Sequence, residues 1–156
     1  MTRVVIQPAG AEAFRIIAAL YAQSFDDPWP EPSVRELLSV HGTWGLVALT
    51  GEAKDPAGFL LARVVADEAE ILSIGISPHR RRTGLAKALL SAAMARMVDS
   101  GAAKVFLEVG TDNPAAMHLY FALGFFEVGR RKKYYRRPNG SYADALVLQK
   151  SLLQAS

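Results

Sequence analysis

A basic loop joins a predicted strand to the longest predicted helix of this 156-residue chain. The loop and the start of the helix read Ser77-Pro78-His79-Arg80-Arg81-Arg82-Thr83-Gly84-Leu85-Ala86. Glycine and alanine leave the backbone uncovered where the first N–H groups of a helix have no partner, and the helix dipole adds positive potential there. The segment therefore predicts a binding site for an anion such as a pyrophosphate group.

Two well-known phosphate-binding motifs do not match this loop. It lacks the Gly-Lys-Ser/Thr ending of the P-loop and the Gly-x-Gly-x-x-Gly turn of dinucleotide-binding domains. A solvated arginine turn before an ordinary helix is the alternative interpretation, and the segment taken alone leaves it open.

Hydrophobic periodicity predicts a mixed α/β chain that forms one domain over residues 1–156. In chain order we expect a strand at 4–6, helices at 11–24 and 33–40, strands at 44–49, 58–65 and 70–77, a helix at 84–100, a strand at 104–109, a helix at 114–123, and strands from 125 and at 142–148. The early strands predict antiparallel hairpins, and the later strand–helix–strand succession predicts a crossover.

Composition limits the chemistry. The chain is 51% hydrophobic and 21% charged, which suits one domain with a buried core. It has no cysteine, which excludes disulfides, thiolate metal sites and a cysteine nucleophile. Because His41, His79 and His118 fall on different predicted elements, we expect no metal cofactor. We expect a cytoplasmic protein without membrane contact, since neither a secretory signal nor a long apolar span is apparent.

Three motifs give the chain a resemblance to a known family. Arg81-Arg82-Thr83-Gly84-Leu85-Ala86 resembles the Gln/Arg-x-x-Gly-x-Gly/Ala motif with which GNAT acyltransferases bind the pyrophosphate of coenzyme A. Two later segments resemble the second half of these enzymes in order and spacing: Leu107-Glu108-Val109 followed by Asn113-Pro114-Ala115-Ala116, and Leu119-Tyr120 through Leu123-Gly124-Phe125.

The resemblance covers nearly the whole chain and implies both fold and reaction. The implied fold is the GNAT acyl-CoA N-acyltransferase fold, a mixed α/β architecture with about six to seven strands in a central sheet and about four helices around it. The implied enzyme is an acetyl-CoA-dependent N-acetyltransferase, in which a primary amine attacks the thioester directly through a tetrahedral intermediate. Acetyl-CoA is the implied cosubstrate.

Within this family the chain is most similar to the RimI-type ribosomal-protein-alanine acetyltransferases. The similarity rests on 25–29, 67–72, 107–109 and 130–135. It implies that the acceptor is a protein N-terminal α-amino group, with a ribosomal protein among the candidates. One departure is Gly110, where such enzymes often carry arginine. Two alternatives stay open: a GNAT enzyme that acetylates lysine or a small-molecule amine, and a catalytically silent acyl-CoA-binding module.

The resemblance assigns two catalytic residues. Glu108 shares a strand face with Phe106, and a carboxylate in this apolar strand is costly unless it is paired. The matching glutamate accepts a proton, through water, from the attacking ammonium group. Tyr120 lies on an apolar helical stripe, and the matching tyrosine protonates the departing thiolate, because a phenol ordinarily has a pKa near that of a thiol. The alternatives are a solvent-facing glutamate on an edge strand and a tyrosine that only packs.

Other residues are implied contacts of coenzyme A. Gly75 interrupts a predicted strand, which indicates a bulge, a close backbone approach or a packing requirement. The backbone of Ile74, Gly75 and Ile76 is implied to pair with the pantetheine amides. Asn113 is expected to cap the following helix and, by the resemblance, to contact pantetheine as well. The residues implied to bind the pyrophosphate are Arg81, Arg82, Thr83, Gly84, Leu85, Ala86 and Lys87.

Aromatic residues are expected at the acceptor site. Phe25 and Trp29 either form a wall of the peptide site or pin their loop to the core, and Tyr135 is expected to contact the acceptor. Tyr135 belongs to the basic run Arg130 to Arg137, which combines cations and aromatic rings as nucleic-acid-binding segments do. Strand alternation at an exposed sheet edge explains the run more simply, so we expect no direct nucleic-acid contact.

Overall fold

The computed structural model describes residues 3–10, 13–25 and 28–153, and its elements follow the predicted order. The strands are β1 (Val4–Ala9), β2 (Thr43–Thr50), β3 (Asp55–Val65), β4 (Glu68–Ile76), β5 (Lys104–Gly110), β6 (Phe126–Arg136) and β7 (Tyr142–Ser151). The helices are α1 (Phe14–Ser24), α2 (Glu31–Ser39), α3 (Leu85–Asp99) and α4 (Pro114–Ala122), and a short 3₁₀ turn, η2 (Pro78–Arg80), occupies part of the predicted basic loop. Ala11, Glu12, Asp26 and Asp27, which the sequence interpretation also used, lie outside the described residues.

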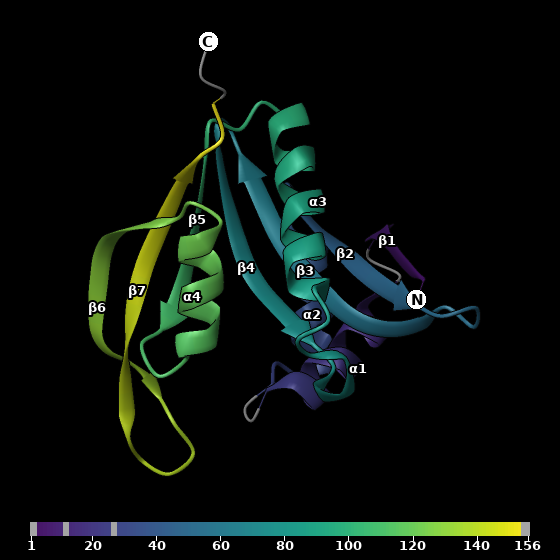
Figure 1. The fold of residues 1–156 in the computed structure, drawn as a ribbon, viewed down its shortest axis with the longest axis horizontal. Helices are drawn as coiled ribbons and strands as arrows, with labels where there is room; N and C mark the ends of the chain where they lie inside the picture. The colour runs from purple at the N-terminus through teal and green to yellow at the C-terminus, as the bar shows by residue number, and fades with distance from the viewer. Residues whose placement is uncertain (1–2, 11–12, 26–27, 154–156) are drawn as a thin grey trace.

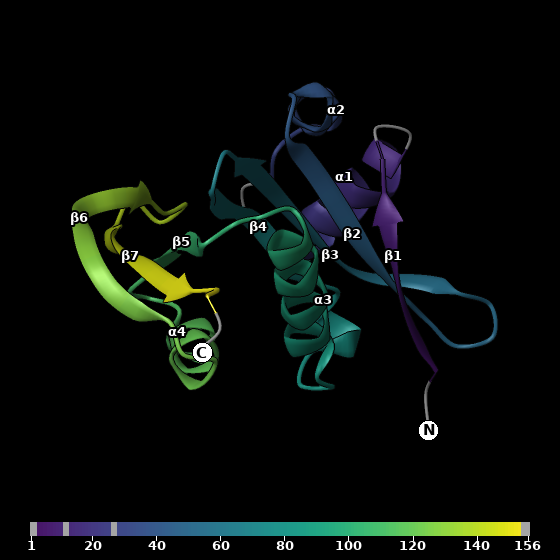
Figure 2. The same cartoon turned by 90° about the horizontal axis from the view of Figure 1, so that it is seen from above.

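The strands of the described chain form one sheet in the order β1-β2-β3-β4-β5-β7-β6 (Figure 1). Neighbouring strands run antiparallel except β4 and β5, which run parallel. Helices α3 and α4 cover one face, whereas α1 and α2 cover the other (Figure 1, Figure 2). The mixed sheet with helices on both faces is the predicted fold class.

The sheet opens between β4 and β5. Their register joins Glu68 to Lys104, Ala69 to Val105 and Glu70 to Phe106. Past these pairs the two strands diverge, as Figure 1 shows. The divergence leaves the second half of β4 and the second half of β5 on opposite sides of an opening in the sheet.

A bulge in β4 lies just before the divergent part. The register between β3 and β4 shifts between Leu61 and Ala62, which pair with Ser73 and Ile71, so Leu72 is the extra residue. An extra residue bends a strand and increases its twist. The bulge thus turns the rest of β4 away from β5. The strand irregularity suggested for Gly75 is therefore located at Leu72.

Gly75 instead provides room for aromatic side chains. A Cβ atom at Gly75 would lie 2.6 Å from Cε1 of Phe59 and 3.1 Å from Cε2 of Phe25. Phe59 is fully buried, and its ring centroid lies 5.3 Å from that of Tyr21 on α1. The structure thus shows the packing requirement among the interpretations of this glycine, and its cause is the packing of Phe59 and of Phe25, which follows α1, against β4.

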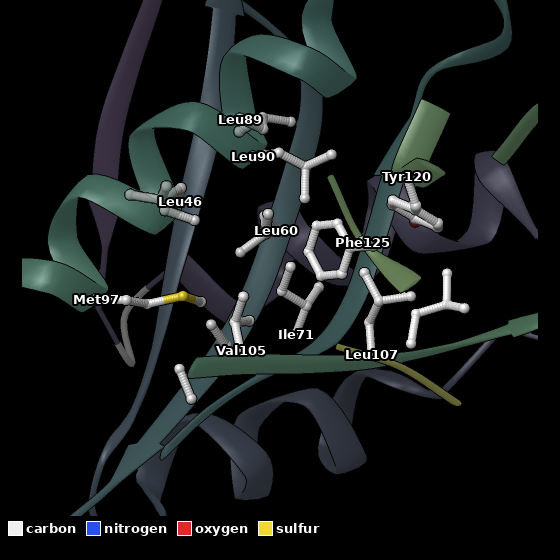
Figure 3. Close-up of a cluster of buried hydrophobic side chains, with 14 of the residues drawn as sticks. Leu46, Leu60, Ile71, Leu89, Leu90, Met97, Val105, Leu107, Tyr120 and Phe125 are labelled. Atoms are coloured by element: carbon white, nitrogen blue, oxygen red, sulfur yellow. The ribbon is translucent and has the colours of Figure 1, made fainter. Parts of the chain in front are cut away.

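The larger of two hydrophobic clusters lies between the sheet and the helices α3 and α4 (Figure 3). Leu60, Leu89 and Met97 are fully buried in it. Tyr120 is also buried there, and its ring meets that of Phe125 edge-on at a centroid distance of 5.8 Å. The core therefore holds the helix that carries Tyr120 against the sheet beside the opening.

Replacing Gly75 with alanine should lower the free energy of unfolding by about 1–3 kcal/mol, because the added methyl group overpacks the Phe59 ring. Urea denaturation would measure the change. Gly129→Ala on β6 is the matched control, since its new Cβ would lie 3.8 Å from the nearest neighbour, an ordinary contact. Equal stability of the two variants would contradict the packing role of Gly75.

Candidate active site

The start of α3 presents free backbone N–H groups. The first helical hydrogen bond runs from the Ala88 N–H to the Gly84 carbonyl (3.0 Å), so the amides of residues 85–87 precede the helical ladder. Among the described residues, no side chain caps them. Arg82 (φ 63°) and Gly84 (φ 84°) both adopt left-handed backbone conformations at the entry to the helix. With the helix dipole added, this end of α3 suits an anionic group.

The side chains of the predicted pyrophosphate-binding residues differ in their surroundings. Arg82, Thr83 and Lys87 are exposed around the start of α3, whereas Leu85 is buried in the core, so only its backbone is available to a ligand. Ala86 is half-buried, and its small side chain leaves the backbone amides uncovered. The predicted segment is thus assembled at one helix end.

Arg81 is turned toward the protein. Its Nε donates to the carbonyl of Ile76 at the end of β4 (3.3 Å), and its Nη2 donates to the carbonyl of Ser24 at the end of α1 (3.1 Å). The Ser24 hydroxyl donates to the same Ile76 carbonyl (3.2 Å). Arg81 therefore ties the basic loop to β4 and to the segment that leads to Phe25.

The free edge of β4 offers backbone groups to the opening. Ser77 donates its N–H to the Ala57 carbonyl (2.8 Å), so these residues form a hydrogen-bonded pair with β3. Such pairs alternate with non-hydrogen-bonded ones in an antiparallel ladder, so Gly75 also directs its N–H and C=O toward β3. The corresponding groups of Ile74 and Ile76 point away from β3, and the Ile76 carbonyl among them is already bound by Arg81 and Ser24. Of the backbone predicted to pair with pantetheine, that of Gly75 is thus engaged within the sheet.

Glu108 lies on β5, an interior strand of the sheet, where it pairs with Val147 of β7. On its other side β5 has already diverged from β4 at this point, so Glu108 borders the opening, as a residue on a strand edge does. Its Oε1 accepts a hydrogen bond from Nε of Arg131 on β6 (2.8 Å), and the side chain is 26% exposed. Arg131 is thus the partner that a carboxylate in an apolar strand requires. Arg131 belongs to the basic run, but the sequence of the run does not predict which of its cations contacts Glu108.

Tyr120 has the burial that its helical stripe predicted. Burial raises the pKa of its phenol to about 12, and the neighbouring Tyr135 adds to the increase. The phenol therefore remains protonated at neutral pH. Its pKa lies farther from that of a thiol than the ordinary phenol value assumed in the sequence interpretation.

The structure brings Tyr135 together with both predicted catalytic residues. Burial, followed by the negative charge of Glu108, raises the pKa of Tyr135 to about 12. Tyr135 in turn is close enough to Tyr120 to influence its titration. Side chains from β5, α4 and β6 thus converge beside the opening between β4 and β5. No local sequence pattern predicts this convergence, because the three elements are far apart in the chain.

Asn113 and the two aromatic residues before α2 occupy places consistent with their predictions. The Asn113 side chain accepts from the Ala116 N–H (3.2 Å), which confirms it as the cap of α4. Phe25 and Trp29 surround the buried Tyr21, with ring centroids 4.6 and 5.2 Å away. Both remain partly exposed, at 39% and 38%. Their rings therefore pin the loop to the core and still present a surface on β4's side of the opening.

The basic run lies on β6, the edge strand of the sheet, as predicted, but strand alternation does not continue through it. The register with β7 shifts between Arg131 and Tyr135. Within the shift Lys133 has a left-handed backbone (φ 50°), and its N–H donates to Oδ1 of Asp144 (2.9 Å). A bulge of this kind re-aims the following side chain. The direction of Tyr135 is therefore set by the irregularity.

No group of three or more histidine, aspartate or glutamate side chains in the described part of the chain could hold a metal ion. No helix there is long and apolar enough to cross a membrane.

Comparison with known proteins identifies similar sequences and structures. The sequence model of the acetyltransferase (GNAT) family matches residues 14–125. The N-alpha-acetyltransferase RimI of Mycobacterium tuberculosis is 38% identical over 138 residues, which make up 85% of this chain and 83% of that protein. The crystal structure of the ribosomal-protein-S18-alanine N-acetyltransferase from Escherichia coli is similar with a TM-score of 0.90 and 27% identity, over 99% of this chain and 97% of that one.

Arabidopsis thaliana NAA60, solved in complex with acetyl-CoA, shares the fold with a TM-score of 0.83 at 18% identity, over 96% of this chain and 98% of that one. The predicted fold and the predicted enzyme class, an acetyl-CoA-dependent N-acetyltransferase, are confirmed. Because the family model spans most of the sequence and agrees with the fold, the chain belongs to the acetyltransferase (GNAT) family.

Proposed function

We propose that this chain transfers the acetyl group of acetyl-CoA to the N-terminal α-amino group of a protein, with Glu108 as general base and Tyr120 as general acid. The observation that carries the proposal is the position of Tyr135 beside Glu108 at the part of β5 that has diverged from β4, where a Cβ atom on Gly110 would lie 3.4 Å from Cδ2 of Tyr135. The influence of Tyr135 on the pKa of the buried Tyr120 agrees with this arrangement. The N-alpha-acetyltransferase and ribosomal-protein-S18-alanine acetyltransferase among the similar proteins support the α-amino group as acceptor.

The open end of α3 and the free edge of β4 form the proposed acetyl-CoA site. The pyrophosphate binds the amides of residues 85–87, with the exposed Arg82, Thr83 and Lys87 around it. The pantetheine arm lies along β4, where it pairs with the N–H and C=O of Ile74 and with the N–H of Ile76, since the Ile76 carbonyl is bound by Arg81 and Ser24. Arg81 supports this site from behind by holding the basic loop to the end of β4. Asn113, at the start of α4, contacts the arm from the other side.

The attacking amine must be neutral, and an α-amino group has an ordinary pKa of about 7.7–8.0, so much of it is protonated near pH 7. Glu108 accepts this proton through a water molecule. Arg131 holds Oε1 of the carboxylate, which leaves Oε2 for the water. The amine nitrogen then bonds to the thioester carbonyl carbon.

The remaining steps use the other groups at the opening. Negative charge develops on the carbonyl oxygen of the tetrahedral intermediate and is stabilised by backbone N–H groups of Ile74 or Ile76. Collapse of the intermediate breaks the carbon–sulfur bond. Tyr120, which is protonated at neutral pH, donates its phenolic proton to the departing thiolate, and the second proton that the amine nitrogen loses as the amide forms restores the phenol through water. Holding amine and thioester together contributes the largest part of the rate increase.

Phe25, Trp29 and Tyr135 enclose the proposed acceptor site. Phe25 and Trp29 expose their rings on the β4 side of the opening, and Tyr135 lies on the β5 side, beside Glu108. A peptide N-terminus inserted between them meets the base at its end. A ribosomal protein that begins with alanine is the first acceptor to test, in line with the Escherichia coli relative.

The acceptor can be identified by mass spectrometry after incubation with acetyl-CoA. We expect a peptide with a free N-terminal alanine to be acetylated, and an N-blocked peptide with an internal lysine, or a polyamine, to remain unmodified. Acetylation of only the lysine peptide or the polyamine would replace the proposal with one of the alternative acceptors. A wild-type chain that modifies none of the three while binding acetyl-CoA would be a silent binding module.

Glu108→Gln should lower kcat/KM about 10²-fold or more near neutral pH, because the base is lost while a hydrogen-bond acceptor for Arg131 is kept. The defect should shrink toward about pH 9, where most of the amine is already neutral. A pH–rate profile measures both effects. Glu127→Gln, an exposed glutamate on β6, is the control and should match the wild type. A defect independent of pH would remove Glu108 from the role of base.

Tyr120→Phe should reduce kcat while it keeps the packing against Phe125. It should also change the alkaline stability. Because the folded pKa is raised from about 10 to about 12, the wild type loses stability as the pH rises through this window. Between pH 9 and pH 11 the free energy of unfolding should therefore fall by about 1 kcal/mol less in Tyr120→Phe than in the wild type. Urea denaturation at the two pH values measures this difference. An unchanged kcat would leave Tyr120 as a packing residue.

A further inference from the structure

A bidentate ion pair joins the loop after β5 to the far end of β6. Nε and Nη2 of Arg137 donate to the two carboxylate oxygens of Asp112, each at 2.6 Å. These hydrogen bonds and the guanidinium charge hold the pKa of Asp112 below its ordinary value. The side chains are 43% and 35% exposed, so solvent screens the pair in part.

The same guanidinium also covers a ring of the proposed acceptor site. The Cζ atom of Arg137 lies 4.8 Å from the ring centroid of Tyr135, whereas Tyr134 contacts that ring edge-on at 5.2 Å. A guanidinium can stack on an aromatic face and bind a carboxylate in its own plane at the same time. Arg137 therefore connects Asp112 directly to Tyr135.

Gly110 leaves the space that this arrangement needs. A Cβ atom there would lie 2.5 Å from Oδ1 of Asp112, 2.6 Å from Nη2 of Arg137 and 3.4 Å from Cδ2 of Tyr135. The backbone of Gly110 is outside the left-handed region, so alanine would cause no backbone strain there. Its methyl group would instead collide with the ion pair. Any side chain at position 110 would occupy the place of the guanidinium. Gly110 departs from the family pattern, and the guanidinium of Arg137 occupies the space that a side chain at this position would fill.

The ladder of β6 and β7 is interrupted before the outer part of this hairpin, and the end itself is closed by a hydrogen bond from the Arg137 N–H to the Ser141 carbonyl (2.8 Å). After the shift that begins at Arg131, the register resumes with Tyr135 opposite Ala143 and Arg136 opposite Tyr142. Beyond this point the chain turns back within a few residues, at Asn139 and Gly140. The β5–α4 loop also contacts the hairpin through the Thr111 N–H, which donates to the Asp144 carbonyl of β7 (2.9 Å), so β7 is fixed to this loop by its backbone. The Asp112–Arg137 pair adds a contact from the same loop to the β6 arm of the hairpin, which carries Tyr135.

We propose that the Asp112–Arg137 pair is a latch that holds the end of the β6–β7 hairpin against the β5–α4 loop and positions Tyr135 for binding of the acceptor peptide. The inference rests on the proposed function, because the proposed acceptor site is what gives Tyr135 its role. Asp112 and Arg137 are positioning residues that act through Tyr135. The acetyl-CoA site on β4 and α3 does not depend on them.

Steady-state kinetics with an alanine-starting peptide test the latch. Asp112→Ala and Arg137→Ala should each raise the KM for the peptide about five- to tenfold, with kcat and the KM for acetyl-CoA within about twofold of the wild type. The double variant should be no worse than Arg137→Ala, because Arg137→Ala already removes the ion pair together with the stacking on Tyr135. Gly110→Ala should reproduce the effect. Arg137→Lys, which keeps the charge without the planar fork, should restore only part of the affinity.

Arg130→Ala is the matched control. Arg130 lies on the same hairpin and pairs with Asp144 and Glu127, which belong to β7 and β6 themselves, so its loss leaves the link to the β5–α4 loop intact. Its peptide KM should stay within about twofold of the wild type. An equal rise of KM in Arg130→Ala and Asp112→Ala would overturn the latch.

Hydrogen exchange of the unliganded chain separates this inference from the proposed function. Residues 131–143 should exchange faster in Asp112→Ala than in the wild type and Arg130→Ala. Unchanged exchange, or additive effects of the two single substitutions on KM, would overturn the latch even in an active enzyme. If the wild type acetylates no peptide, the proposed function fails, and the exchange measurement alone decides whether the pair holds the hairpin.

Discussion

The site depends on the early divergence of β4 and β5. A regular parallel ladder along both strands would have used the backbone groups of Ile74 and Ile76 and covered Glu108 from the side. The bulge at Leu72 prevents this, because it bends β4 away just after the paired segment. The resulting opening gives the two strands different tasks. One presents backbone hydrogen-bonding groups and the other presents a carboxylate, and the hydrophobic core under α3 and α4 keeps the opening in place.

Electrostatic contacts organise the β5 side of this opening. Arg131 pairs with Glu108 and Arg137 pairs with Asp112, so two arginines of β6 and its turn bind two carboxylates of β5 and its loop. Between these pairs Tyr135 has a raised pKa, chiefly from burial and then from Glu108. The basic run is therefore partly neutralised from within the fold. Arg131 and Arg137 therefore arrange the site through these ion pairs, apart from any effect of the basic run on the approach of a partner.

The β4 side is organised by packing instead of charge. Phe25 and Trp29 pack around Tyr21, and Gly75 allows Phe25 and Phe59 to approach β4 closely. Arg81 adds a direct connection between the basic loop before α3 and the end of α1. The proposed cosubstrate site and the loop that carries Phe25 and Trp29 are thus held by the same contacts.

The sequence by itself determined the order of the elements, the open start of α3, the cap at Asn113 and the residue types Glu108 and Tyr120, because periodicity, capping and motif spacing are local properties. Its motifs also indicated the family before any fold was available. Only the tertiary structure decided that Leu72 is the bulge, that Arg131 is the partner of Glu108, and that Arg137 fills the space left by Gly110. These features depend on strand register and on contacts between distant segments, and a shift of one residue in either strand would change every partner.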